Sequence, residues 1–465
     1  MRLWLSLSLG EKALVALFLL TLSFAQPRLQ ADGIGYYAYA RSILIDHNLE
    51  FKGDWRPPNF GDVDIAGYIN GRPILTHYTK TGHRANHFAV GPAMLWFPFL
   101  AVTHGVVLAV DELGAMIPAD GHSRPYLVTM ACATALYGFL GLWLSFRLAR
   151  NYFKEPEAFL ATIGIWLASS LPAYMYAQPS WAHAQSVFAC SLFLWYWHRT
   201  MGTRTNLQWL VLGAIAGLMI EVYYASFVFL LAPAIEIVLL LTTAWRKPAE
   251  RWAAVLRIVR RGLLFAGCAF LVFVPTLITR QVIYGSPLSV GLYTEKGWNW
   301  SHPAFWQILF SSQRGLVVWT PILVPASCGL LCLRRRDAKF AGILLAITGA
   351  FYLLIALDPW WDGVASFGNR YFVTLTPVFV LGLSGALAWF IGQWKAQNAG
   401  LRRAVAILVV LIVWNLGLVY QWGTGLLPNT GPISWEEVVY NQFRVVPGQL
   451  LGSLRVESTK ANGIR

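Results

Sequence analysis

Apolar segments, several of them long enough to cross a lipid bilayer, recur along almost the whole chain. Twelve such segments are bounded by charged residues or by Pro and Gly, at about residues 13–25, 88–110, 127–147, 158–177, 183–198, 206–222, 224–243, 262–279, 316–333, 340–357, 372–391 and 404–421. A helix of about 20 apolar residues spans a hydrocarbon core about 30 Å thick. The predicted fold class is therefore all-α, a polytopic integral membrane protein.

The composition excludes two other classes of protein. Of the 465 residues, 57% are hydrophobic and only 12% are charged, whereas about 25% are charged in a typical soluble domain. Such a chain cannot cover a water-facing surface with polar side chains, and disorder would need low hydrophobicity. The five cysteines all lie inside apolar runs, so they predict no disulfide framework and, without a nearby His or carboxylate, no metal site.

The excess of basic residues is explained by membrane topology. There are 36 Lys and Arg against 22 Asp and Glu, which gives a net charge of +14. No basic block is interleaved with base-stacking aromatic residues outside an apolar run, so we expect no nucleic-acid partner. Lys and Arg collect instead in the short cytoplasmic loops of membrane proteins.

How well the basic residues fit this rule depends on whether the segment 88–110 crosses the membrane. If it enters and leaves on the same face, 20 of the 36 basic residues fall in short cytoplasmic segments. They are Arg2, Lys12, Arg147, Arg150, Lys154, Arg199, Arg204, those from Arg246 to Arg261, Arg334, Arg335, Arg336, Lys339, Lys395, Arg402 and Arg403. We therefore predict about 11 transmembrane helices and a re-entrant or interfacial helix at 88–110, where Pro92 and Pro98 favour a bent segment.

This topology places the N-terminus in the cytoplasm and the C-terminus outside. It gives a transmembrane domain at 1–421, with a long first outer loop at 26–126, and a C-terminal outer tail at 422–465. The first apolar run also has features of a cleaved signal peptide. The same features fit a retained helix that tethers the segment after it.

The segment just after the first apolar run predicts an amphipathic helix on the outer surface. Asp32, Tyr36 and Tyr39 fall on one face of this helix, and Tyr37 and Arg41 fall on the next. Two interpretations remain open. Asp32 is either a helix cap below a belt of interfacial tyrosines or a functional carboxylate close to the membrane.

The overall layout and four patches of sequence carry a resemblance to a known family. The patches are Asp32 to Asp46, Lys80 to Pro98, Ser311 to Pro321, and Phe367-Gly368-Asn369-Arg370-Tyr371 with Pro377. Together with the short first span and the long outer loop, they resemble the GT-C polytopic glycosyltransferases, which include protein O-mannosyltransferases and aminoarabinose transferases. Many members carry Asp-Glu where this chain has Asp32-Gly33.

The resemblance implies a set of site residues. In that family, the Asp beyond the first span is the general base, and an Arg-Tyr pair at a late span contacts the phosphate of a polyprenyl-phosphate sugar. The matching residues here are Asp32, and Arg370 with Tyr371.

The residue types support the same chemistry independently. Moving a sugar from a lipid phosphate to a hydroxyl needs a carboxylate to take the proton and cations to hold the departing phosphate. Asp32 or Asp46 could supply the carboxylate. Under the predicted topology, the candidate cations on the outer face are Arg370, Lys80, Arg41 and Arg314.

Several of these residues also have a purely structural interpretation. Arg370 could be an interfacial anchor among tryptophans, and Arg314 could belong to a capping turn. The basic turn from Lys80 to His87 points at the start of the 88–110 helix, where it could bind a phosphate or remain a solvated loop. His183 could be a packed bundle histidine or a substrate contact.

The remaining candidates are aromatic and acidic residues. We predict that aromatic side chains stack the sugar or guide the prenyl chain, and the candidates are Tyr36, Tyr37, Trp360 and Trp361. Asp62-Val63-Asp64 has a spacing that can bind a metal, but two carboxylates without further ligands are a weak signal. We expect no metal and no cofactor.

The sequence thus predicts a membrane glycosyltransferase of the bacterial inner membrane with its active site facing the periplasm. It would move a hexose or pentose from a polyprenyl-phosphate donor to a lipid, glycan or protein acceptor, by an inverting mechanism. The alternative is a transporter or flippase of lipid-linked sugars. The clustering of ionisable residues at outer helix ends, rather than at mid-bilayer, favours the transferase.

Overall fold

The computed structural model describes residues 7–54, 78–246, 248–291, 297–428 and 430–452, and the backbone of 68–69 and 72–73. Within these residues the fold is helical apart from one short antiparallel pair, β1 (Tyr68–Ile69) with β2 (Arg72–Pro73). The predicted all-α class is therefore confirmed. The Asp62-Val63-Asp64 motif lies outside the described residues.

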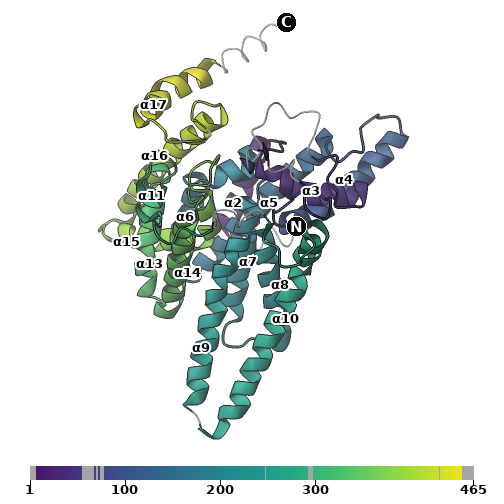
Figure 1. The fold of residues 1–465 in the computed structure, drawn as a ribbon. Helices are drawn as coiled ribbons and strands as arrows, with labels where there is room; N and C mark the ends of the chain where they lie inside the picture. Colours follow the sequence, from purple (N-terminus) through teal and green to yellow (C-terminus); the bar gives the residue numbers. More distant parts are fainter. Residues whose placement is uncertain are drawn as a thin grey trace.

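The helices form one elongated bundle with short helices at its upper end (Figure 1). In chain order they are α2 (Leu9–Thr21), α3 (Asp32–Arg41), α4 (Gly91–Glu112), α5 (Arg124–Ala149), α6 (Glu155–Leu167), α7 (His183–Thr200), α8 (Asn206–Val222), α9 (Leu231–Trp245), α10 (Arg251–Tyr284), α11 (Phe305–Phe310), α12 (Leu316–Trp319), α13 (Leu323–Arg334), α14 (Ala338–Leu357), α15 (Thr376–Gly392), α16 (Gln397–Gly423) and α17 (Trp435–Tyr440). Short 3-10 helices η5 (Tyr224–Leu230) and η8 (Arg370–Leu375) precede α9 and α15.

Seven helical segments in the described part of the chain are long and apolar enough to cross a membrane. They are Gly91–Glu112, Arg124–Ala149, Tyr224–Trp245, Arg251–Tyr284, Ala338–Leu357, Arg370–Gly392 and Gln397–Gly423. The apolar helices α8 and α13 are shorter. A multi-pass membrane protein is therefore supported, while the number of about 11 spans stays a prediction.

Segments that the sequence assigns to the cytoplasmic side lie together in the structure. Tyr152, after α5, shares hydrogen bonds with His198 at the end of α7 (2.6 Å) and with Asp337 before α14 (3.1 Å). The start of α2 joins the same region, since the Gly10 N–H donates to Glu155. Loops far apart in sequence thus meet on one face, as the distribution of basic residues predicts.

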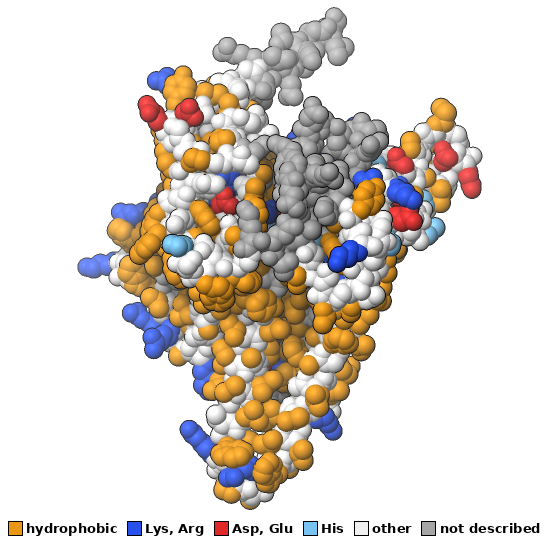
Figure 2. All heavy atoms as spheres, in the orientation of Figure 1, with side chains coloured by type: hydrophobic (Ala, Val, Ile, Leu, Met, Phe, Trp, Pro, Cys, Tyr) orange, Lys and Arg blue, Asp and Glu red, His pale blue; other side chains and the backbone are white. Residues whose placement is uncertain are grey.

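The two ends of the molecule differ in charge. Figure 1 shows the α9–α10 hairpin reaching the lower tip, with α3, α4 and α17 at the other end. Figure 2 shows Lys and Arg side chains at that tip, a broad hydrophobic surface above it, and most of the visible Asp and Glu near the top.

Helix α4 is continuous and lies beside the first half of α5. The Trp96 indole donates to Thr134, and His104 bonds Tyr126, so the two helices are antiparallel. The sequence predicts a bend in this segment, but the structure shows one unbroken helix that includes Pro98. Its contacts with α5 extend from Tyr126 to Tyr137, whose hydroxyl donates to the Leu95 carbonyl. The helix is long and apolar enough to cross a membrane, so the re-entrant or interfacial placement of this segment stays a prediction.

The tail after α16 packs against the bundle. Leu427, Ile433 and Val438 are buried in the main hydrophobic core. The Gln442 side chain bonds Gln421 of α16 and lies close to Gly417. Helix α16 ends at Gly423, two residues after the predicted boundary, and the segment that follows it is docked on the bundle. The division into two domains stays a prediction.

Helices α13 and α15 approach through glycines, which provides a test of the packing. A Cβ on Gly329 would lie 1.9 Å from the Gly382 carbonyl oxygen. We expect Gly329→Ala to lower the melting temperature, at a cost of about 1–3 kcal/mol for overpacking. Gly349→Ala is the control, because no atom lies within 4 Å of that position in α14. An equal melting temperature for both variants would contradict this packing.

Candidate active site

An ion pair joins two of the residues that the sequence singles out. Arg370 Nη1 lies 2.6 Å from Asp32 Oδ2, although the residues are 338 positions apart. The two side chains are 12% and 15% exposed. The pair is therefore largely shielded from water but still reachable from one side.

Local backbone geometry sets the position of Asp32. The helix cap of α3 is Ala31, which has a φ of 45°, and Asp32 is the first helical residue, with no side-chain capping bond. The capping interpretation of Asp32 is thus not what the structure shows. A non-glycine residue held at positive φ is strained, and such strain is frequent next to functional groups.

An aromatic wall covers the guanidinium group. Arg370 stacks over the Trp181 ring at 4.4 Å, a cation–π contact, and lies 5.5 Å from the Tyr371 ring. The Trp181 indole N–H donates to the Gln30 carbonyl, and Gln178 donates to the Gln30 side chain. The extended segment before α3 is therefore bound to the turn at 178–181, whose Trp181 ring contacts Arg370.

Gly33 lies in close contact with the turn at 178–181. A Cβ at Gly33 would lie 2.0 Å from Ser180 Oγ. We expect Gly33→Ala to push α3 away from the 178–181 turn, which separates Asp32 from Arg370 and lowers activity. A second change, Ser180→Gly, should restore part of the activity.

The matched control for this prediction is Gly105→Ala, since nothing lies within 4 Å of Gly105 in α4. Both variants are compared by sugar transfer and by melting temperature. Full activity of Gly33→Ala would show that the close approach of α3 is not needed.

The loop before Arg370 is held from several sides. The Tyr371 hydroxyl donates to the Trp360 carbonyl (3.0 Å), and Asn369 donates to the Trp361 carbonyl (2.9 Å). Trp360 itself is 40% exposed. The two tryptophans thus contribute their backbone carbonyl groups to the loop.

Arg314 supports the same loop. It is fully buried, and its guanidinium donates to the carbonyl oxygens of Ser366 (2.7 Å) and Gly431 (3.1 Å). Burial lowers the pKa of Arg314. These contacts bind the loop to the C-terminal tail, and the role of Arg314 as a phosphate contact stays a prediction.

His183 lies behind the wall. Its ring is 4.8 Å from Tyr174, 5.5 Å from Tyr223 and 6.0 Å from Trp181. Its Nδ1 is buried and has no hydrogen-bond partner among the described residues. The structure therefore brings His183, Arg370, Tyr371 and Asp32 together.

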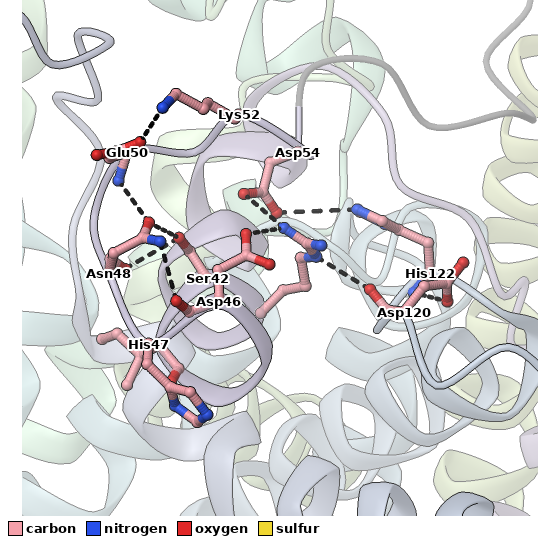
Figure 3. Close-up of polar contacts among 11 residues, drawn as sticks. Ser42, Asp46, His47, Asn48, Glu50, Lys52, Asp54, Asp120 and His122 are labelled. Carbon is pink, nitrogen blue, oxygen red and sulfur yellow. Dashed lines mark hydrogen bonds and ion pairs between the residues drawn. The ribbon is translucent and has the colours of Figure 1, made fainter.

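Two other predicted residues belong to a second cluster around Arg41 (Figure 3). The Arg41 guanidinium pairs with Asp46 and, at 3.5 Å, with Asp54, and it donates to the Asp120 carbonyl at 3.0 Å. Figure 3 shows these acidic residues converging on one guanidinium group. Arg41 and Asp46 thus bind each other rather than the Asp32 pair.

The aromatic residues of α3 are packed away from solvent. The Tyr37 hydroxyl donates to the Gly121 carbonyl (2.6 Å), and its ring lies 6.0 Å from Trp96. Tyr36 is buried against Phe88 at 5.0 Å. As placed here, both tyrosines fix α3 on its neighbours, so we leave them out of the proposed sugar contact.

The second cluster contains a titratable pair. Asp54 lies 3.8 Å from His122. Burial raises the pKa of Asp54 to about 7, although Arg41 opposes this, and burial together with Arg41 lowers the pKa of His122 to about 4. His122 is therefore neutral at physiological pH.

The raised pKa of Asp54 leads to a prediction about how the stability of the folded protein depends on pH. Its folded-state pKa is higher than its ordinary value of 3.8, so the contribution of Asp54 to stability falls as pH rises from about 4 to 7, whereas the lowered pKa of His122 makes a contribution of opposite sign. Asp54→Asn removes only the first contribution, so its melting temperature should rise more steeply with pH over this range than that of the wild type. Glu50→Gln, on an exposed carboxylate of the same loop, should keep the wild-type profile. Parallel profiles for the wild type and Asp54→Asn would refute the prediction.

The structure also reveals a cation that the sequence reasoning missed. Arg280, near the end of α10, is buried and donates to the carbonyl oxygens of Asn86 (3.1 Å) and His87 and to the Tyr224 hydroxyl (3.2 Å). Among the described residues it forms no ion pair with a carboxylate. The available signal was a lone Arg directly after the apolar run 262–279, since a charge at the membrane is typical of functional sites.

Arg280 links the basic turn at 80–87 to the rest of the site. Thr81 donates to the Ile283 carbonyl (2.6 Å), and Lys80 is exposed beside it. Burial lowers the pKa of His87 to about 3, and Arg280 contributes to this shift. His87 is therefore uncharged, and the positive charges of this region are those of Arg280, Lys80 and Arg84.

No group of three or more His, Cys, Asp or Glu in the described part of the chain is arranged to hold a metal ion. The candidate site has two cationic regions, one around Arg370 and one around Arg280. The neighbouring residues Tyr223 and Tyr224 connect the two regions. Tyr223 contacts His183 beside Arg370, and the Tyr224 hydroxyl bonds Arg280.

Comparison with known proteins indicates the class. Residues 126–278, about a third of the chain, match the family model described as dolichyl-phosphate-mannose-protein mannosyltransferase. This match confirms the resemblance to GT-C glycosyltransferases that the sequence predicts. No curated protein matches the chain.

Three solved structures are similar in layout. ArnT from Cupriavidus metallidurans bound to undecaprenyl phosphate is 15% identical, with 92% of this chain and 74% of that chain covered and a TM-score of 0.49. The apo form is 14% identical, with 92% and 73% covered and a TM-score of 0.46. The oligosaccharyltransferase of Archaeoglobus fulgidus, in complex with Zn and sulfate, is 15% identical, with 90% and 53% covered and a TM-score of 0.45.

Proposed function

We propose that this chain is a membrane glycosyltransferase that moves a sugar from a polyprenyl-phosphate-linked donor to an acceptor hydroxyl. The observation that carries the proposal is the Asp32–Arg370 pair, a carboxylate held by a cation beneath an aromatic wall. The family match over residues 126–278 supports the same reaction class. The donor sugar is a hexose or a pentose, and the acceptor is a lipid, a glycan or a protein.

Asp32 would act as the general base. Its carboxylate takes the proton of the acceptor hydroxyl while the hydroxyl oxygen bonds to the anomeric carbon of the sugar. The bond from that carbon to the phosphate oxygen breaks, and the lipid phosphate leaves with the bonding electrons. Attack from the side opposite the leaving group inverts the anomeric configuration.

Arg370 would orient Asp32, because its Nη1 bonds one carboxylate oxygen and its guanidinium plane lies on Trp181. The charge that develops on the leaving phosphate needs cations in a shielded site. Arg280 and the exposed Lys80 beside it are the groups that we assign to this role. The ring of Trp360 could stack on the sugar.

In a bacterial cell this site would face the periplasm from the inner membrane. The distribution of basic residues supports that orientation, because the predicted topology puts the segments rich in Lys and Arg in the cytoplasm and Asp32 outside. The grouping of charges at helix ends argues against a transport site at mid-bilayer.

The test is transfer by the purified chain in lipid vesicles. A panel of radiolabelled polyprenyl-phosphate sugars is supplied with lipid, glycan and peptide acceptors, and the label is followed out of the polyprenyl fraction. Wild-type protein should transfer label from at least one donor. Label that changes leaflet but stays on the polyprenyl lipid would identify a flippase and overturn the proposal.

A further inference from the structure

A basic cavity lies at the end of the α8–α10 pair, far from the residues of the proposed reaction. This cavity is open to the surface, is formed by the start of α8 and the first turns of α10, and has a volume of about 520 Å³. Arg257, Arg260 and Arg261 line it together with Asn206 and Leu256. Arg280 lies near the opposite end of α10.

The helical repeat and close packing build this cavity. The three arginines are spaced i, i+3 and i+4, so they share one face of α10. Helix α8 packs directly against α10, since a Cβ on Gly213 would lie 2.3 Å from the Phe265 carbonyl oxygen. The end of α8 is thereby held beside the arginine face.

The positive charge in the cavity is not neutralised by the described part of the protein. None of the three arginines forms an ion pair with a described Asp or Glu side chain, and Glu236 of the adjacent α9 is already bound by Arg204 at 3.1 Å. The first-turn N–H groups of Asn206 and Leu207 have no acceptor within α8 and add partial positive charge. The cavity is therefore suited to an anion.

Apolar side chains beside the cavity favour a lipid over a free anion. Leu256 in its wall is 68% exposed, as is Leu263 further along α10, and Leu207 on α8 is 69% exposed. Figure 2 shows the hydrophobic surface directly above the basic tip. A phosphate among the arginines would thus have its acyl chains beside these leucines.

We propose that this cavity binds the phosphate headgroup of an anionic phospholipid, with the acyl chains lying along α8 and α10. Arginine can contact two phosphate oxygens at once, so three arginines favour a headgroup with two phosphates over a headgroup with one. This site is independent of the proposed sugar transfer, because none of its residues belongs to the Asp32 region.

The test is lipid binding by the purified full-length chain in neutral detergent, measured by native mass spectrometry during titration with phosphatidylglycerol, cardiolipin and phosphatidylcholine. The variant Arg257→Gln/Arg260→Gln/Arg261→Gln should bind the two anionic lipids about tenfold more weakly or worse, because charge-assisted hydrogen bonds are lost. The control Arg334→Gln/Arg335→Gln/Arg402→Gln removes the same charge from the same predicted face. It should bind like the wild type.

Equal losses in both triple variants would show general attraction to a basic surface and would overturn the site. Unchanged binding by the first variant would do the same. Full competition by excess inorganic phosphate would assign the cavity to a free anion instead of a lipid. If the triple Gln variant does not fold, Arg260→Gln alone supplies the comparison, and it should bind cardiolipin more weakly than Arg334→Gln does.

Discussion

Replacing Asp32 by Asn is expected to lower sugar transfer by a factor on the order of 10² to 10⁴, the usual effect of losing a general base. Asn has almost the same shape and can still accept a hydrogen bond from Arg370 Nη1, which lies 2.6 Å from Asp32 Oδ2. It cannot take the proton of the acceptor hydroxyl. The measurement is the rate at which label leaves the polyprenyl-phosphate donor.

The control is Asp46→Asn, which removes a carboxylate from the same outer loop but from the Arg41 cluster. Arg41 keeps Asp54 as a partner at 3.5 Å, so this variant should retain most of the activity. A near-normal rate in Asp32→Asn would remove Asp32 from the mechanism. Loss of activity confined to Asp46→Asn would move the base to the second cluster.

Loss of folding must be separated from loss of chemistry. Removing one partner of a fully buried ion pair costs about 3–5 kcal/mol, and less where water still reaches the pair. Asp32 and Arg370 keep 15% and 12% exposure, so Asp32→Asn should lower the melting temperature moderately. Asp32→Asn with Arg370→Gln should recover stability, because no unpaired charge remains, but should not recover transfer.

Replacing Arg370 by Lys is expected to lower transfer about tenfold or more, while donor binding weakens less. Lys keeps the positive charge but loses the planar group that stacks on Trp181 at 4.4 Å. The carboxylate of Asp32 would then lose its fixed orientation at the moment when the proton is transferred. Rate and donor affinity are measured on the same sample.

Arg403→Lys is the matched control for this prediction. Arg403 also stacks on an indole, Trp394, at 3.5 Å, but in a segment that is predicted to lie on the cytoplasmic face. An interfacial anchor tolerates Lys, so Arg403→Lys should transfer sugar at the wild-type rate. Equal and small effects of both substitutions would leave Arg370 as a membrane anchor.

The sequence identifies the members of the site but not their pairing. Asp32 and Arg370 each stand at the edge of an apolar run, where a charge is costly, and this marks both residues. Their ion pair depends on how α3 and η8 meet across the bundle, which local pattern does not encode. For the same reason the sequence offers Asp46 as an equal candidate, although in the structure Arg41 binds it.

By itself, the sequence determines the helical membrane class and the resemblance to GT-C enzymes, and it predicts which segments face the two sides of the membrane. These follow from local composition, because a bilayer demands long apolar helices and sorts Lys and Arg between its faces. Only the tertiary structure decides that Arg370 serves Asp32, that Arg314 holds a loop, and that Arg280 is buried beside the turn at 80–87. Each depends on contacts between distant segments, and a guanidinium group binds whichever oxygen atoms the packing brings to it.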